Sequence, residues 1–145
     1  MKQEWISYLQ EISVPDRYVS NVEKKINEVS SIFNTEIKRI FVCNRQSEQK
    51  IEYSSLWLFS EDRVYECKNF ISKEDYDVLI FRNKIAYVNI QKSDFDNIEN
   101  PSTTSSLNAV CLLKDINMSC SLSSVGVNTK YLLELLKEIY LKNLI

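Results

Sequence analysis

The chain has no histidine and only one glycine, Gly126, among its 145 residues. Histidine is the most common general base and a frequent zinc or haem ligand, so its absence removes the usual partner of a nucleophile and of a metal. A glycine-rich phosphate-binding loop needs several glycines at fixed spacing, which one glycine does not supply. The four cysteines also lack CxxC spacing. We therefore expect no catalytic residues, no metal site and no cofactor, and a protein that is not an enzyme.

Long apolar runs are missing as well. In the amino-terminal segment MKQEWISYLQEI the longest uninterrupted apolar run is the pair Trp5-Ile6. A secretion signal needs a longer apolar centre, and no window of the chain approaches the roughly 18 consecutive apolar residues of a membrane helix. The sequence thus predicts a cytoplasmic protein without a membrane span.

The two signs of charge nearly balance. The chain has 18 lysines and arginines and 20 aspartates and glutamates, which gives a net charge of −2. This balance offers no overall attraction to nucleic acid, which we do not expect as a partner. Arg45, Lys50 and Arg82 flank predicted hairpin loops, and together they could hold an anionic headgroup, the one lipid contact that the sequence suggests. Charges beside turns are more often simply solvated.

In a reducing cytoplasm, Cys43, Cys67, Cys111 and Cys120 are expected to be reduced and buried. A hairpin turn at Asp115-Ile116 would place Cys111 directly across from Cys120, on one face of the sheet. A disulfide is then geometrically conceivable. Two buried thiols are the main interpretation of this pair, and a redox switch is the alternative.

Two stretches before residue 35 have apolar residues at helical spacing. The first ends before Val14-Pro15, and the second runs from Asp16 to Phe33 with charged residues, Lys25 among them, off its apolar face. The apolar stripe of the second helix consists of Val19, Val22, Ile26, Val29 and Phe33. At the other end of the chain, Asn128 is a plausible N-cap for a final amphipathic helix.

Between these helices the period changes from 3.6 to 2, which predicts a sheet. Polar residues such as Asn44 and Asn83-Lys84 bound the strands, and short connections imply antiparallel hairpins. The KSDFDNIENPSTTSS stretch is expected to be an exposed, mobile loop. The candidate strands are Ile37–Cys43, Ile51–Ser60, Arg63–Phe70, Asp77–Arg82, Ile85–Lys92, Leu107–Lys114 and Asn117–Val125.

These elements predict one α+β domain over residues 1–145. It consists of an amino-terminal helical segment over 1–34, an antiparallel sheet of about seven strands over 35–125, and one carboxyl-terminal capping helix over 128–144. The length agrees with a single core.

The YSSLWLFSEDRVYE stretch raises the question of whether Trp57 and Phe59 bind a partner or pack inside the protein. A hairpin turning at Glu61-Asp62 would place Phe59 opposite Val64 and Trp57 opposite Glu66. Leu56, Leu58, Tyr65 and Cys67 would then occupy the other face. We favour packing, with Trp57 and Phe59 under an amino-terminal helix or a neighbouring sheet, and we keep a partner surface as the alternative.

The order of strands and helix resembles the pleckstrin-homology-like superfold in its bacterial or intracellular versions. The resemblance covers residues 35–145 and rests on LWLFSEDRVYE, AYVNIQKSDFDNI and SVGVNTKYLLELLKEIYL. It implies a barrel or sandwich that binds a lipid, peptide or protein and is rarely an enzyme. Members that bind phosphoinositides have a dense basic motif at the first hairpin, where CNRQSEQKIEY offers only Arg45 and Lys50. The helices before residue 35 are additions to the minimal fold.

The main functional hypothesis is a non-catalytic protein-interaction domain, such as a small bacterial or phage-borne regulator, inhibitor or immunity protein that occludes another protein. One alternative is a ligand-binding or enzymatic α+β cone of the nuclear-transport-factor-like kind, with Tyr53, Tyr87 and Asn89 pointing into a cavity. Another is a homodimer similar to a secretion chaperone. Val110 and Leu112, on the face opposite Cys111, leave self-association open.

Overall fold

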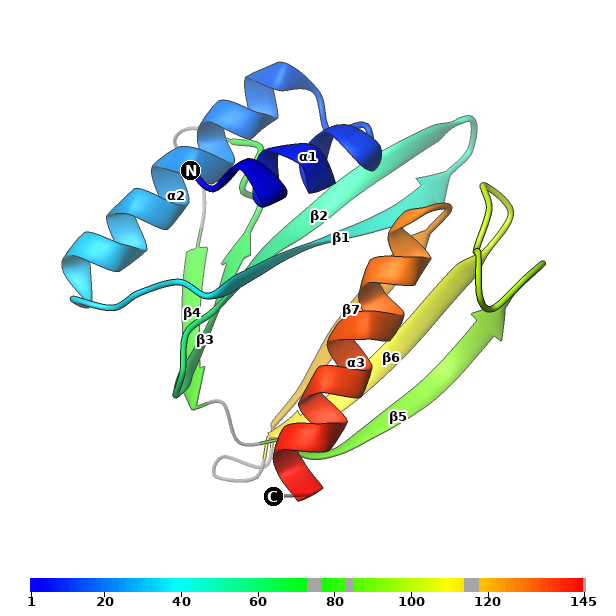
Figure 1. The fold of residues 1–145 in the computed structure, drawn as a ribbon. Helices are drawn as coiled ribbons and strands as arrows, with labels where there is room; N and C mark the ends of the chain where they lie inside the picture. Colours follow the sequence, from blue (N-terminus) through cyan, green and yellow to red (C-terminus); the bar gives the residue numbers. More distant parts are fainter. Residues whose placement is uncertain (73–76, 83–84, 114–117, 145) are drawn as a thin grey trace. The chain divides into compact units, whose positions relative to one another are not determined.

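The computed structural model describes residues 1–72, 77–82, 85–113 and 118–144. These residues form an α+β chain with three helices and seven antiparallel strands, as the sequence predicts (Figure 1). The turns expected at Asn83-Lys84 and Asp115-Ile116 lie outside the described residues. The helices are α1 (Gln3–Glu11), α2 (Asp16–Ile32) and α3 (Asn128–Leu144), and the strands are β1 (Arg39–Ser47), β2 (Lys50–Phe59), β3 (Arg63–Lys68), β4 (Asp77–Arg82), β5 (Ile85–Asp94), β6 (Ser106–Leu113) and β7 (Met118–Val125).

The strands form two sheets. Sheet A has the order β1-β2-β3-β4, and sheet B has the order β5-β6-β7. The chain divides into two compact units, the first made of Met1–Cys43 and Tyr53–Asn83, the second of Asn44–Glu52 and Lys84–Ile145. The tip of the β1–β2 hairpin therefore belongs to the second unit. The expectation of a single domain over 1–145 stays a prediction.

In the first unit, α2 lies across one face of sheet A. The β2–β3 hairpin has the predicted register, with Trp57 opposite Glu66 and Phe59 opposite Val64. The other face of this hairpin carries Leu56, Leu58, Tyr65 and Cys67, and all four side chains are buried. The ring of Phe33, at the carboxyl end of α2, lies 5.4 Å from the ring of Tyr65. Helix α2 thus packs on the leucine face.

Helix α1 is fixed to sheet A by two tyrosines. The amide of Val42 donates a hydrogen bond of 3.0 Å to the hydroxyl of Tyr8, whose ring stacks 6.5 Å from that of Phe41. The hydroxyl of Tyr53 donates to the carbonyl of Ile12, at 2.8 Å, where α1 ends. The bond from Tyr53 satisfies a carbonyl that the end of α1 leaves without a partner inside the helix.

In the second unit, α3 packs on sheet B. Residues of β6 alternate between the two faces, so that Ala109, Cys111 and Leu113 are buried while Val110 and Leu112 are half-buried. Helix α3 contacts all three strands of the sheet. Its buried apolar side chains include Leu132, Leu135, Leu136 and Ile139, which follow one another at helical spacing.

Asn44 is not the turn residue that its polarity suggested, since β1 continues through it to Ser47. Its side chain is 2% exposed, and its Oδ1 accepts hydrogen bonds of 2.9 Å from the amide of Val125 and from Nδ2 of Asn128. The polar side chain therefore satisfies two donors where β7 ends and α3 begins. The chain reverses direction between β1 and β2 later, at Glu48, which has a φ of 52°.

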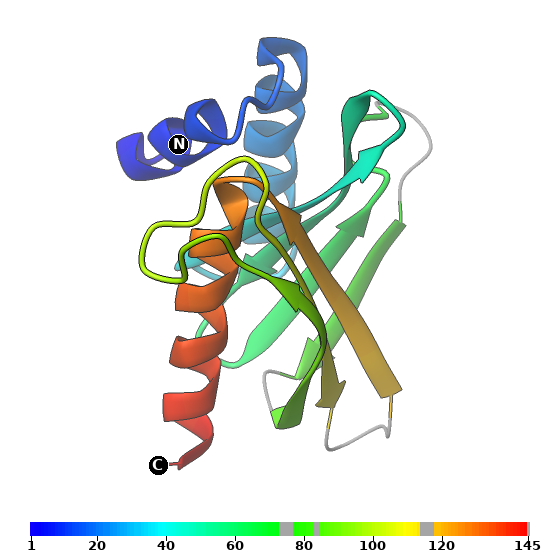
Figure 2. The same ribbon diagram turned by 90° about the vertical axis from the view of Figure 1, so that its right-hand side faces the viewer.

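The stretch between β5 and β6 makes several hydrogen bonds and is partly buried, unlike the exposed loop that the sequence predicts. Oδ1 of Asp96 accepts hydrogen bonds from the amide of Ser102, at 3.1 Å, and from the hydroxyl of Ser105. The amide of Gly126 donates to the carbonyl of Ser105, at 2.8 Å, and Pro101 is buried. Figure 2 shows this segment running beside the first turn of α3. The expected exposure holds only for part of the loop.

Asp96 should make the stability of the chain sensitive to acid. Hydrogen bonds from Ser102 and Ser105 hold the pKa of Asp96 well below its usual value. Because the pKa is lower in the folded chain, this stabilisation is present above the unfolded pKa, about 4, and is lost as the pH falls below it. We expect the thermal midpoint to fall more steeply below about pH 4 in the wild type than in Asp96→Asn. Asp94→Asn is the matched control, and equal slopes for the wild type and Asp96→Asn would contradict the expectation.

None of the described helices is long and apolar enough to cross a membrane.

Candidate functional site

Apolar side chains come to the surface where α2 runs past the sheet. Ile32 and Phe33 follow the buried Val29 by three and four residues, which places them on the face of α2 that packs on sheet A. Yet Ile32 is 71% exposed and Phe33 is 43% exposed. The apolar stripe therefore continues beyond the part of the helix that the sheet covers.

Strand β4 extends this exposed apolar surface. Ile80 pairs with Tyr65 in register, so it lies on the face of sheet A that Phe33 touches. Ile80 is 43% exposed, and Val78, two residues earlier on the same face, is half-buried. We name Ile32, Phe33, Val78 and Ile80 the α2–β4 surface.

The backbone of β4 adds hydrogen-bonding capacity to this surface. Its pairing with β3 runs from Asp77 opposite Lys68 to Arg82 opposite Arg63, and the strand ends the order of sheet A. No strand in the described ranges pairs with its other edge. An edge strand of this kind leaves backbone N–H and C=O groups that an added strand can pair.

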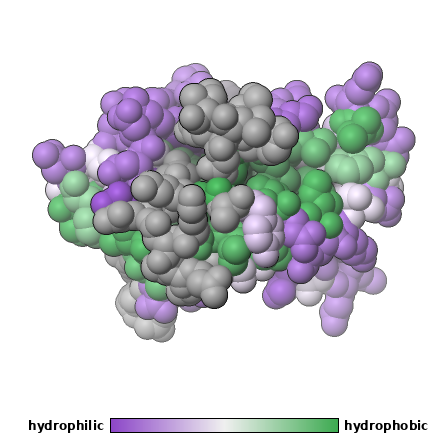
Figure 3. Space-filling model, turned by 90° about the horizontal axis from the view of Figure 1, so that it is seen from below, coloured by the Kyte–Doolittle hydropathy of each residue, from purple (hydrophilic) through white to green (hydrophobic). Residues whose placement is uncertain are grey.

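The sequence pattern predicted only part of this surface. It placed Phe33 on the apolar stripe and Ile80 in a strand, but it assigned neither side chain to an exposed surface. Side-chain periodicity gives the direction of a face, not the width of the sheet beneath it. The sequence therefore does not show that the apolar stripe of α2 extends beyond the part that the sheet covers. In the space-filling view of Figure 3, apolar side chains lie at the surface between hydrophilic ones.

Lys25 is buried under α2, contrary to the prediction that it lies off the apolar face. Its side chain is 1% exposed, and its Nζ lies 3.8 Å from Oε2 of Glu28. Burial lowers the pKa of Lys25, and Glu28 opposes this shift. Burial also raises the pKa of Cys67 to about 12, while the charge of Lys25 opposes it. Because its pKa is so high, almost none of the Cys67 side chain is in the thiolate form at neutral pH, and Cys67 is a poor nucleophile.

A second buried polar group lies on the opposite face of sheet A. The hydroxyl of Ser55 donates to Oε2 of Glu66, at 3.2 Å, and burial raises the pKa of Glu66. Trp57 faces Glu66 across the strands, and its indole N–H is the one buried side-chain donor without a hydrogen-bond partner in the part of the chain that the structure describes. The sequence predicted that Trp57 lies opposite Glu66, but it contains no motif that shows the burial of the Glu66 side chain or the missing partner of the indole N–H among the described residues.

Trp57 and Phe59, considered above as a partner surface, are 1% and 6% exposed. Their burial favours packing over an exposed binding surface.

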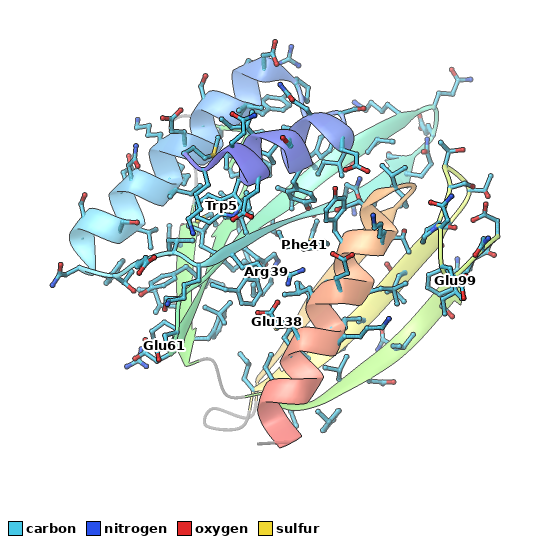
Figure 4. The ribbon with its side chains drawn as sticks, viewed as in Figure 1. Trp5, Arg39, Phe41, Glu61, Glu99 and Glu138 are labelled. Carbon is cyan, nitrogen blue, oxygen red and sulfur yellow. The ribbon has the colours of Figure 1, made fainter. Side chains whose placement is uncertain are left out.

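In the turn that joins β2 to β3, Glu61 is exposed, and it is labelled in Figure 4.

The three candidate anion contacts are not brought together within one unit. Arg45 and Lys50 lie near the tip of the β1–β2 hairpin, in the second unit, while Arg82 ends β4 in the first unit. Nε and Nη2 of Arg45 both donate to Oε2 of Glu52, at 3.1 and 3.0 Å. The carboxylate holds the guanidinium and lowers its attraction for a further anion.

The outer face of sheet B carries scattered apolar side chains. Tyr87 pairs with Leu112, and Asn89 pairs with Val110, so these four residues share the face opposite Cys111. Tyr87 and Asn89 are exposed, and Val110 and Leu112 are half-buried. Exposed positions do not line a cavity, in contrast to what the cone-like alternative requires of Tyr87 and Asn89.

None of the four cysteines forms a disulfide, and Cys111 lies directly opposite Cys120 as predicted. Groups of three or more side chains that could bind a metal do not occur among the described residues. Comparisons of the chain with protein-family models, with curated proteins and with solved structures found no match.

Proposed function

We propose that this chain is a non-catalytic protein-interaction domain with a pleckstrin-homology-like sandwich fold. Its role is that of a small regulator, inhibitor or immunity protein, which acts by covering a surface of another protein. The observation that carries the proposal is the α2–β4 surface, where exposed apolar side chains lie beside an edge strand.

The partner is an extended segment of another protein. Such a segment adds to the free edge of β4 through backbone hydrogen bonds, and its alternate apolar side chains pack on Phe33 and Ile80. The backbone bonds supply orientation, while the buried apolar contacts supply most of the affinity. The seven antiparallel strands followed by α3 support the fold assignment, because this order matches the superfold named above.

The test is capture of partners from a lysate of the native host with the tagged full chain, followed by quantitative mass spectrometry. The variant combines Ile32→Glu with Ile80→Lys, which puts charge on the apolar surface and a lysine on the edge strand. We expect a stoichiometric partner that the wild type captures and that this variant loses, at least tenfold. Because both side chains are exposed, the thermal midpoint should change little.

Ile98→Glu is the matched control. Ile98 is an isoleucine of similar exposure, 62%, in the segment between β5 and β6 of the second unit. Capture by this variant should equal that of the wild type. Equal capture by the wild type and the double variant would exclude the α2–β4 surface, and the absence of any stoichiometric partner would count against an interaction domain.

A further inference from the structure

Cys111 and Cys120 are direct neighbours across β6 and β7. The pairing of these strands runs from Ser106 opposite Val125 to Leu113 opposite Met118 without a shift in register. Directly opposed residues of an antiparallel pair point to the same face of the sheet. The two thiols therefore share the face that carries Leu113 and is covered by α3.

The spacing of opposed residues suits a disulfide. In antiparallel sheets the Cα atoms of such residues are about 4.5 or 5.5 Å apart, depending on the hydrogen-bonding pattern. Both values lie within the range of about 4.4 to 6.8 Å found for disulfide-bonded cysteines. The Sγ of Cys120 already lies 3.7 Å from the carbonyl oxygen of Cys111. The spacing that the register predicts is therefore one at which disulfides form.

The two thiols differ in exposure. Cys111 is fully buried, whereas Cys120 is half-buried on β7, which is the edge strand of sheet B. An oxidant in solution therefore reaches Cys120 first. The other two cysteines, Cys43 and Cys67, are buried in the first unit, and the raised pKa of Cys67 keeps it as an unreactive thiol.

We propose that Cys111 and Cys120 form an oxidation site, in which a peroxide or a small disulfide converts the two thiols into one cross-strand disulfide. With hydrogen peroxide, the thiol of Cys120 loses its proton and the thiolate attacks one oxygen; the O–O bond breaks, and the leaving hydroxide takes up that proton to become water, which gives a sulfenic acid. Sγ of Cys111 then attacks Sγ of Cys120, the S–O bond breaks, and a second water leaves. Two thiols and one peroxide thus become one disulfide and two waters.

The bond would fix the β6–β7 hairpin. It closes a short covalent ring between positions 111 and 120 and removes conformations of the unfolded chain, which raises stability. It also prevents slippage between β6, which carries Val110 and Leu112, and β7, so the outer face of sheet B becomes more rigid in the oxidised protein. This inference does not depend on the proposed function of the α2–β4 surface.

The test is oxidation of the purified full chain with hydrogen peroxide or oxidised glutathione, followed by thiol counting, intact mass and peptide mapping. The chain has four cysteines, and we expect two thiols to remain after oxidation. The mass should fall by two hydrogens, and the mapped link should join Cys111 to Cys120 within one molecule. The thermal midpoint should rise on oxidation and return to its starting value after reduction with dithiothreitol.

The matched control moves one thiol to the other face while keeping the number of cysteines. Cys120→Ser combined with Ser121→Cys moves the thiol by one residue, so its separation from Cys111 along the sequence is almost unchanged. Position 121, however, pairs with Val110 on the outer face. If register directs the reaction, this variant should retain four thiols under the same conditions. Four free thiols in the oxidised wild type, a link to Cys43 or Cys67, or equal oxidation of the control would each overturn the proposal.

Discussion

Trp57→Ala should lower the free energy of unfolding by about 3–5 kcal/mol, the range for removal of a buried aromatic side chain. Trp57 is among the largest fully buried side chains of the chain, so its removal leaves a cavity that its neighbours fill only in part. Urea denaturation followed by far-ultraviolet circular dichroism gives the measurement without relying on tryptophan fluorescence. A loss below about 0.5 kcal/mol would show that the side chain is not packed in a core.

Trp57→Phe is the informative companion variant. It keeps most of the apolar volume and removes the indole N–H, which has no hydrogen-bond partner among the described residues. Deleting an unsatisfied buried donor recovers part of its desolvation cost, so the expected loss is below about 2 kcal/mol. A loss as large as that of Trp57→Ala would mean that the indole N–H makes an essential hydrogen bond.

Asn44→Ala should destabilise the chain by about 2–6 kcal/mol, because one buried and one partly buried donor lose their acceptor at about 1–3 kcal/mol each. These donors are the amide of Val125 and the side-chain amide of Asn128, both 2.9 Å from Oδ1 of Asn44. Thermal and urea denaturation measure the change. The loss should exceed what the small change in side-chain volume explains.

Two controls separate the acceptor role from a general effect of removing an amide. Asn108→Ala removes an exposed side chain of the same type from β6 and should change stability by less than about 0.5 kcal/mol. Asn44→Ala and Asn128→Ala should also be non-additive when combined, because they remove one shared hydrogen bond. An effect of Asn44→Ala no larger than that of Asn108→Ala would exclude the acceptor role.

The elements of the fold could be predicted from the sequence because each has a strong local signal. The register of the β2–β3 hairpin followed from one short polar turn and strict alternation, and Trp57 opposite Glu66 is confirmed. Cys111 opposite Cys120 is confirmed for the same reason. In both cases neighbouring residues decide the outcome, so no knowledge of distant contacts is required.

Residues whose role depends on distant partners were assigned wrongly. Asn44 looked like a turn residue, because its bonds go to residues 81 and 84 positions further along the chain. Lys25 looked like part of the solvated side of α2, because charge alone does not reveal that Glu28 and Cys67 surround its buried side chain. Phe33 was placed on the right face, but the sequence does not show where the sheet below it ends.

The hydrogen bonds of Asn44 also set an order of events during synthesis. All residues of the first unit are present once Asn83 has been made, whereas the second unit needs both the hairpin tip at 44–52 and α3. At about 5–20 residues per second, the ribosome adds the 84 residues between Asn44 and Asn128 in about 4–17 s. For most of this interval, neither of the donors that Oδ1 of Asn44 binds in the folded chain has been made. The hairpin tip is therefore synthesised early but can reach its native contacts only after the last part of the chain has been made.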